Sequence, residues 1–383
     1  MKKKYSLNLS KQLTKKLNIV CFDVPFPATY GGVMDVFYKI RSLSESGIQI
    51  YLHVFHYGRQ EQVELTKYCT KVNYYPRKTT FINNIGFLPY IVKSRSNKDL
   101  ISNLKAVEAP ILFEGLHSTL ALKRNVFEGR KTFIRTHNIE HLYYNHLAKN
   151  ESNIFKKFFY KMEAGKLKYY ERILKKCDHI LSISINETNY FKKKYGSGTE
   201  YLPAFHPNES IYPLTKKGYF ALYHGNLAID DNLKAALYLI DCFKPLDYPL
   251  VIAGQCENKK LLTQIDMYKN ISFIQLKDEH HLLELFHRAH INVLFSYQQS
   301  GVKLKLINAL FQGRYTIANS NIAEGSGLEE LCHIANDKNE IRSAILKLID
   351  LDFSDEEIAK RKRILVDFNN KKNAQKIIEL LNS

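Results

Sequence analysis

The sequence contains no tryptophan, and its six cysteines are scattered along 383 residues. They form no CxxC pair and no other close spacing, which excludes a disulfide framework and a cysteine zinc cluster. Long apolar runs are missing too: no segment reaches about 18 apolar residues, and no continuous apolar stretch follows the lysine-rich start. We therefore expect neither a membrane span nor a secretory signal, and we predict a cytoplasmic protein.

Familiar cofactor and catalytic motifs are also absent. The sequence has no GxGxxG fingerprint, P-loop, nucleophile elbow or kinase signature, which disfavours nicotinamide, flavin and P-loop enzymes. His137 and His141 have the four-residue spacing of helical zinc ligands, but the glutamate of the HExxH pattern is missing. We predict no cofactor and no metal.

Acidic residues are few: 38 Asp and Glu stand against 56 Lys and Arg, giving a formal net charge of +18. Such a balance favours polyanionic partners, namely phosphate ligands, nucleic acid or acidic lipid. No RRM, helix-turn-helix or KH pattern occurs, so we predict no nucleic-acid partner.

The segment from 155 to 177 is both aromatic and basic. Phe155, Phe158, Phe159 and Met162 recur at helical spacing, which suits an amphipathic helix on an anionic membrane. Packing of the same residues into the protein's own core, with lysines outside, is the favoured alternative.

Short apolar runs alternate with helical patterns along the whole chain, which is typical of βαβ units around parallel sheets. The stretch from 203 to 218 carries three prolines and no periodic pattern, so it predicts an interdomain linker. We predict an α/β protein of two doubly wound, Rossmann-like domains, 1–203 and 204–370, and a helix at 371–383. That helix either crosses back to the first domain or packs on the second. Ligands of such sheets bind beyond the carboxyl ends of the strands, which places the site in the cleft between the domains.

Two lysines stand near the start of an apolar helix predicted from residue 302 onward. Lys303 and Lys305 are unfavourable at the positive end of a helix unless an anion lies beside them. Gly301, Lys305, Asn308 and Gln312 share one narrow face, which suits a pocket lining. A half-buried helix edge with lysines reaching water is the alternative interpretation.

Polar or flexible residues also follow two predicted strands of the first domain. Gly31 and Gly32 bring bare backbone to the start of a helix, which suits close approach of a phosphate or sugar. The segment TFIRTHNIE places Arg135, His137 and Asn138 at the end of another strand.

Five motifs then occur in a telling order: PFPATYGG, RTHNIE, YHGNL, VIAGQ, and GVKLKLINALFQGRYTIANS with EGSGLE after it. Over residues 17–350 this order resembles the GT-B glycosyltransferases, specifically retaining family 4. The resemblance implies transfer of a sugar from a nucleotide-diphosphate donor held by the second domain to an acceptor held mainly by the first. It implies that no metal is needed.

The resemblance also implies roles for individual residues. His137 would contact the transferred sugar, Lys303 and Lys305 would face the donor's phosphates, and Leu276 would lie near the base. The residues implied in binding the donor or acceptor are Gly31, Gly32, Arg135, Asn138, Gly225, Asn226, Leu276, Ser300, Gly301, Val302 and Asn308.

Some positions depart from the family pattern. Ser300 and Asn308 stand where members typically carry two glutamates, the second of which grips the ribose. Asn226 and Asp231 stand where many members have an arginine and a lysine.

The sequence therefore supports two hypotheses. The first is a transferase for surface polysaccharide or glycolipid synthesis, with a glycan or polyprenyl-lipid-linked acceptor and possible contact with the inner, anionic face of the plasma membrane. The second is a non-catalytic protein that binds a sugar nucleotide or glycan and scaffolds a biosynthetic complex.

Overall fold

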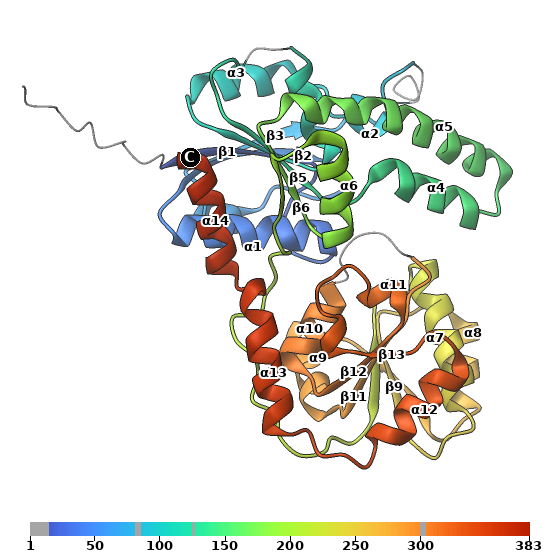
Figure 1. Cartoon of the computed structure of the whole chain (residues 1–383). Coiled ribbons are helices and arrows are strands. Elements are labelled where there is room, and N and C mark those ends of the chain that lie inside the picture. Colours follow the sequence, from blue (N-terminus) through green and yellow to red (C-terminus); the bar gives the residue numbers. More distant parts are fainter. Residues whose placement is uncertain (1–14, 81–85, 125–126, 299–303) are drawn as a thin grey trace, which may run out of the picture.

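The computed structural model describes residues 15–80, 86–124, 127–298 and 304–383, and these form two fully parallel sheets flanked by helices (Figure 1). The first sheet has the spatial order β3 (Lys71–Pro76), β2 (Gln49–His56), β1 (Lys16–Cys21), β4 (Ile111–Glu114), β5 (Thr132–Thr136), β6 (His179–Ser182) and β7 (Thr199–Tyr201). The second has the order β10 (Ile271–Gln275), β9 (Leu250–Gly254), β8 (Ala221–His224), β11 (Ile291–Leu294), β12 (Tyr315–Ala318) and β13 (His333–Ile334). The predicted architecture of two doubly wound α/β domains is confirmed.

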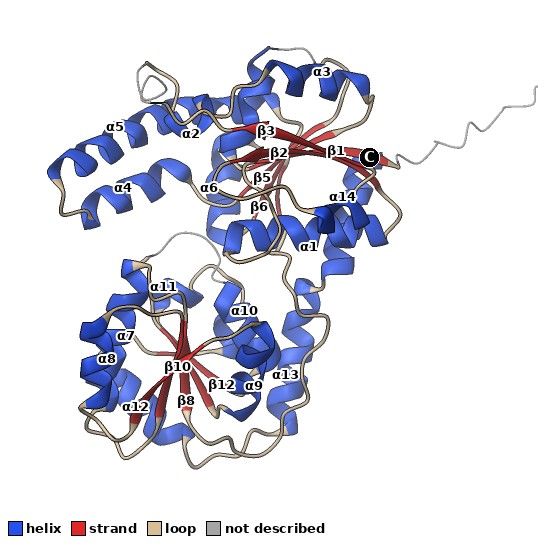
Figure 2. Ribbon diagram, turned by 180° about the vertical axis from the view of Figure 1, so that it is seen from behind, coloured by secondary structure: helices blue, strands red, loops and turns tan. Residues whose placement is uncertain are grey.

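Helices connect the strands and cover the sheets on both faces, as Figure 2 shows most clearly for the second domain. The helices of the first domain are α1 (Gly31–Glu45), α2 (Tyr90–Lys93), α3 (Lys98–Ala106), α4 (Glu140–Asn150), α5 (Ile154–Tyr170) and α6 (Ile185–Tyr195). The second domain has α7 (Asp230–Phe243), α8 (Lys259–Asp266), α9 (Glu279–Arg288), α10 (Leu304–Gln312), α11 (Ser320–Ala323) and α12 (Lys338–Leu348). The chain ends with α13 (Asp355–Leu365) and α14 (Asn370–Asn382). Short 3₁₀ segments are η1 (Val63–Lys67), η3 (Leu116–Arg124), η4 (Glu171–Lys176), η5 (Glu329–Leu331) and η6 (Val366–Phe368).

The central strands are apolar because helices cover both faces of each sheet. All five residues of β9 are buried, as are all four of β4, β8 and β11. The strand order reverses between β1 and β4 in the first sheet and between β8 and β11 in the second. These two reversals are the points at which doubly wound sheets bind ligands, beyond the carboxyl ends of the strands.

The last helix, α14, lies on the first domain although it follows the second in sequence (Figure 1). Its residues Ala374, Ile377 and Leu381 are buried in the same cluster as apolar residues of α1. The linker between the domains runs from the end of β7 at Tyr201 to the start of β8 at Ala221. The boundary at residues 203 and 204 falls within this connection and stays a prediction.

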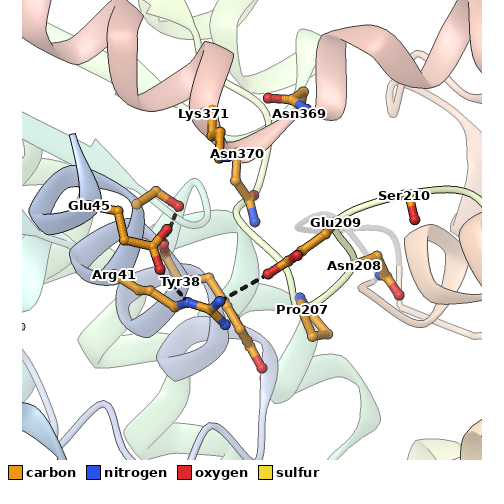
Figure 3. A pocket seen from close by; sticks show the side chains of 11 residues that line it. Tyr38, Arg41, Glu45, Pro207, Asn208, Glu209, Ser210, Asn369, Asn370 and Lys371 are labelled. Atoms are coloured by element: carbon orange, nitrogen blue, oxygen red, sulfur yellow. Dashed lines mark hydrogen bonds and ion pairs between the residues drawn. The ribbon is translucent and has the colours of Figure 1, made fainter.

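The two segments that join the domains are bonded to each other. The His206 N–H donates to Asn370 Oδ1 at 3.2 Å, and Asn370 Nδ2 donates to the His206 carbonyl at 2.7 Å. Between them and α1 lies a cavity of about 710 Å³, beside which Arg41 joins Glu45 and Glu209 (Figure 3). The residues that line this cavity are Tyr38, Arg41, Ser42, Glu45, Pro207, Asn208, Glu209, Ser210, Asn369, Asn370 and Lys371.

Among the described residues, no helix is both long enough and apolar enough to cross a bilayer.

Candidate active site

His137 stands directly after β5, beside the point where the first sheet reverses its strand order. Its Nε2 lies 3.1 Å from Glu114 Oε2 at the end of β4, and its ring meets the ring of Phe22 edge-on at 5.5 Å. A carboxylate only accepts hydrogen bonds, so His137 donates through Nε2–H, and Nδ1 is left for another partner. Glu114 thus fixes the orientation of the predicted sugar-contacting histidine.

Beneath this pair lies a fully buried network of charges. Lys39 Nζ bridges Asp35 Oδ2 at 2.9 Å and Glu114 Oε1 at 2.8 Å, and both Lys39 and Asp35 belong to α1. Arg135 forks onto Asp35 with bonds of 3.0 and 2.8 Å. Burial alone would raise the pKa of Asp35, but the charges of Arg135 and Lys39 outweigh it and hold that pKa well below its ordinary value.

Arg135 is therefore not free to meet a ligand, which corrects the prediction that it binds the donor or acceptor. Its side chain is fully buried, and beyond Asp35 its guanidinium donates to the carbonyls of Leu202 and Pro203. These bonds hold the start of the interdomain linker against the first sheet. The arginine points into the domain because its partner, Asp35, lies inside it.

Asp35, Glu114 and His137 bring three possible metal ligands within 4.8 Å of one another. The ammonium group of Lys39 lies in ion-pair contact with both carboxylates, and Arg135 takes the remaining charge of Asp35. Two fixed cations thus already neutralise the two anions, so the group does not fit a metal ion.

Asn138 and Glu140 follow His137 at the start of α4. The Asn138 side chain is hydrogen-bonded to the buried Glu140 carboxyl, whose pKa burial raises to about 7 while this bond opposes the rise. In the structure the Asn138 side chain thus bonds the Glu140 carboxyl, and a contact of Asn138 with a substrate stays a prediction.

Gly31 and Gly32 form the start of α1, which has no side-chain cap on its first N–H groups. A Cβ at Gly31 would lie 3.9 Å from Leu304 Cδ1, so the starts of α1 and α10 face each other across the two domains. A Cβ at Gly32 would press on Phe22 at 3.0 Å. Two helix N-termini at one place favour an anion, because each carries about half a positive charge.

Lys305 lies one residue inside the start of α10. Its Nζ donates to Asn232 Oδ1 at 3.1 Å and stands 5.6 Å from the centre of the Tyr223 ring. Asp231 is near enough to act on its charge, but no described carboxylate lies within the 4.0 Å of an ion pair with Lys305. The Asp231 carboxylate instead accepts from Ser296 Oγ at 2.9 Å. Burial lowers the pKa of Lys305 to about 8, with Asp231 opposing the shift. A half-buried cation without a counter-ion among the described residues favours an incoming anion.

Gly225 and Asn226 follow β8, at the reversal in the second sheet. The Gly225 carbonyl packs so closely on Gly254 that a Cβ at Gly254 would lie 2.1 Å from it. Asn226 accepts from Asn232 Nδ2 through its carbonyl at 2.9 Å, and so orients the amide that holds Lys305. Leu276 follows β10, where its carbonyl accepts from Gln255 Nε2 at 2.6 Å. Contact of these residues with a donor stays a prediction.

Asn308 faces the interdomain linker. Its Oδ1 accepts from Asn208 Nδ2 at 2.8 Å, and Gln312 Nε2 donates to Asn208 Oδ1 at 2.9 Å. The polar stripe of α10 is thus matched by a linker amide at these two positions, which corrects the interpretation of the whole stripe as a pocket lining. A ribose contact by Asn308 stays a prediction, and it requires the amide pair with Asn208 to open. Four further predicted residues lie outside the described residues: Ser300, Gly301, Val302 and Lys303.

Sequence reasoning missed the residues that hold His137 and Lys305 in place. Glu114 ends a predicted strand, and a carboxylate in an otherwise apolar run such as PILFEG is a signal that could have found it. Asp35 and Lys39 stand four apart on one helix, which is the spacing of an ion pair. Asn232 gave no comparable signal, because its partner is more than seventy residues away.

Residues 219–351 match the family described as glycosyl transferases group 1. The 44.6 kDa protein in the cps region of Klebsiella pneumoniae is 28% identical over 345 residues, which is 84% of this chain and 88% of that one.

Solved structures resemble the whole chain at low sequence identity. A mutant of S. aureus TarM in complex with Fondaparinux, alpha-GlcNAc-glycerol and UDP gives a TM-score of 0.67 at 11% identity, covering 97% of this chain and 100% of its own. A glycosyltransferase from Rickettsia africae gives 0.63 at 14%, covering 96% and 98%. The lipopolysaccharide outer core galactosyltransferase WaaB gives 0.63 at 12%, covering 94% and 98%. The predicted GT-B architecture is confirmed, and the finer assignment to retaining family 4 stays a prediction.

Proposed function

We propose that this chain, a group 1 glycosyltransferase with the GT-B fold, moves a sugar from a nucleotide-diphosphate donor to a glycan or polyprenyl-lipid-linked acceptor. We further propose that the anomeric configuration is retained, that no metal takes part, and that the product belongs to a surface polysaccharide or glycolipid. The cps-region relative and the UDP-containing TarM complex support this choice of donor and product class. On this proposal the protein works in the cytoplasm, at the inner face of the plasma membrane.

Lys305 is the observation that carries the proposal. It is a half-buried cation that forms no ion pair with any described residue, and it lies next to the start of α10 and opposite the start of α1. Negative charge develops on the diphosphate as the bond to the sugar breaks, and a fixed cation and helix N-termini aimed at that charge stabilise the transition state. The same groups, already in place before reaction, need no reorganisation.

His137, oriented by Glu114, would bind the transferred sugar. With Nε2–H held by Glu114, Nδ1 of His137 can accept a hydrogen bond from a sugar hydroxyl. No described side chain stands out as a general base for the acceptor, so we propose that the departing diphosphate takes the acceptor's proton.

A second candidate function is a non-catalytic sugar-nucleotide or glycan-binding protein that scaffolds a biosynthetic complex. The observation in its favour is Asn308, which stands at a typical glutamate position and is paired with the linker residue Asn208. Asp231 beside Lys305 also weakens the positive field at the place where phosphate would lie.

Thermal unfolding with UDP, GDP, dTDP, ADP and CMP, each at millimolar concentration, tests the donor site. A ligand at about a hundred times its dissociation constant stabilises the native state by roughly 2.7 kcal/mol, which shifts the midpoint visibly. We expect one diphosphate to stabilise selectively. Hydrolysis of the matching nucleotide sugar then separates the two functions, because the scaffold would bind the donor without cleaving it. The absence of any shift contradicts the transferase and a sugar-nucleotide-binding scaffold, and it leaves only a glycan-binding scaffold.

A further inference from the structure

The helices α4 and α5 extend sideways from the first domain and pack against each other (Figures 1 and 2). Large apolar side chains of α5 stand in solvent: Phe155 is 83% exposed, Phe158 71% and Tyr169 67%, and Met162 is also exposed. We call these four residues the α5 stripe. The favoured prediction that Phe155, Phe158, Phe159 and Met162 pack into the core is wrong for Phe155, Phe158 and Met162.

The α5 stripe is one continuous face of the helix. Its members are spaced by three, four and seven residues, which places them in one row along the axis. Ala164, Leu167 and Tyr170 lie on another face and supply the contacts with the domain. A helix with one apolar face buried and a second apolar face exposed indicates an interaction surface.

Charge on this part of the chain is one-sided. Residues 140–176 contain nine Lys and Arg against four Glu. Glu140, Glu163 and Glu171 are buried, and the half-buried Glu151 accepts from the N–H of Asn153. The basic side chains that are exposed are Lys149, Lys156, Lys161, Lys168, Arg172, Lys175 and Lys176.

The basic residues also lie in a useful place. Lys161 and Lys168 are seven residues apart, and helical geometry puts both along one edge of the α5 stripe. An apolar row with a basic row beside it, on a helix that protrudes from the fold, is the arrangement of helices that lie in the interface of a membrane.

We propose that the α5 stripe and its flanking lysines dock the protein on an anionic lipid bilayer. This proposal rests on the proposed function, since it supplies the surface from which a lipid-linked acceptor is reached. Anionic headgroups complement the lysines, while the aromatic side chains and Met162 enter the boundary between headgroups and acyl chains. A second copy of this chain fits less well, because its own stripe would bring lysines against lysines.

The docking face is connected directly to the candidate active site. α4 begins three residues after His137 and spans 11 residues, roughly 16 Å, before the chain turns into α5. A surface bound to α5 thus lies about one short helix away from the sugar-contacting histidine. An acceptor anchored in that surface needs only a headgroup of a few sugar units to reach the cleft.

Because the chain has no tryptophan, Phe158→Trp creates a single fluorescent reporter on the stripe. We expect its emission to shift to the blue with vesicles of phosphatidylglycerol and phosphatidylcholine, and the shift to weaken at high salt. Tyr219→Trp, at a 74% exposed position of the second domain, is the matched control and should not shift. An unchanged emission of Phe158→Trp with anionic vesicles overturns the proposal, and an equal shift with pure phosphatidylcholine overturns its electrostatic part.

Co-sedimentation of the otherwise unaltered chain with the same vesicles is the second measurement. Phe155→Glu with Phe158→Glu should lower vesicle binding at least tenfold and leave the unfolding midpoint and its shift by nucleotide diphosphates unchanged. Equal vesicle binding by this variant overturns the proposal. Self-association in sedimentation velocity that the same changes abolish, without vesicle binding, assigns the stripe to a second copy instead. Vesicle binding without any nucleotide-induced shift leaves the docking surface standing and contradicts the proposed function.

Discussion

Both domains carry positive side chains near the reversal of the strand order, but the surroundings of these charges differ. In the first domain, Lys39 and Arg135 face Asp35 and Glu114, and all four charges are met inside the protein. In the second, Lys305 contacts an amide and an aromatic ring and forms no ion pair with a described residue. A charged side chain inside a domain therefore does not by itself indicate a binding site. A cation whose ion-pair partners are all within the protein stabilises the fold, whereas a cation without such a partner can bind an anionic ligand.

Removing a partner from the buried ion pairs of the first domain should have the largest effect, which is a loss of stability. Asp35→Ala leaves Arg135 and Lys39 buried, with Lys39 retaining only Glu114 and Arg135 retaining only carbonyl partners, which should lower the free energy of unfolding by about 3–5 kcal/mol. Urea denaturation measures this loss. Arg41→Ala, on the same helix but in exposed ion pairs with Glu45 and Glu209, is the control and should cost less than about 1 kcal/mol. Equal losses for the two variants would remove the distinction drawn for the first domain.

Removing Lys305, the cation without an ion pair to a described residue, should affect catalysis instead of folding. Lys305→Ala should lower turnover by about 10²–10³-fold, or roughly 2.7–4 kcal/mol of transition-state stabilisation, since it removes a charge aimed at the leaving group. Its unfolding midpoint should stay at or above that of the unaltered protein, because the change removes a half-buried cation that has no ion pair with a described residue. Initial rates of nucleotide release measure the effect, with Lys234→Ala on the exposed side of α7 as the control. Turnover equal to that of the unaltered protein would sink the role assigned to Lys305.

Affinity for the nucleotide diphosphate should depend on pH through Lys305. Its pKa of about 8 means that the ammonium form, which attracts the diphosphate, is present below pH 8 and is lost as pH rises through this value. Affinity should therefore be level on the acidic side of pH 8, once the phosphates are fully ionised, and fall by up to about tenfold per pH unit above it. Calorimetric titration between pH 7 and 9.5 measures this slope. Lys305→Arg, which keeps its charge throughout, should flatten the curve, and an unchanged slope in that variant would place the titration elsewhere.

The smallest effect should come from the amide that holds the lysine. Asn232→Ala removes one hydrogen bond to Lys305 and should weaken diphosphate binding by about fivefold, or roughly 1 kcal/mol. Asn232→Asp should weaken it further, because the new carboxylate pairs with the ammonium and competes with the phosphates. The same calorimetric titration measures both variants. Tighter binding by Asn232→Asp would show that Lys305 does not meet the phosphates.

Local patterns in the sequence sufficed for the fold, and they also selected the candidate site residues Lys305 and His137. The alternation of apolar runs with helical spacing predicted the two sheets, and Lys305 at the start of an apolar helix predicted an anion. His137 followed from its place at a strand end. In each case the deciding neighbours lie within a few residues, so the period of the pattern carries the information.

Other residues could not be placed from sequence because their partners come from distant parts of the chain. Arg135 was predicted to bind the donor or acceptor, yet its counter-ion Asp35 lies one hundred residues earlier and meets it only in the folded domain. The face of α5 that carries Phe155 and Phe158 has the same period whether it packs inside or stands in solvent. Which face the domain covers is decided by tertiary packing, and the sequence contains no local record of it.

The amide pair between His206 and Asn370 joins the two interdomain segments into a single band, and this has a mechanical consequence. Two unconnected interdomain segments would let one domain twist and slide over the other. Two segments that are hydrogen-bonded to each other bend easily about one axis only. Any opening of the cleft should therefore be a hinge rotation about one axis. In this rotation α14 should move as part of the first domain, and the 710 Å³ cavity at the hinge should change its volume.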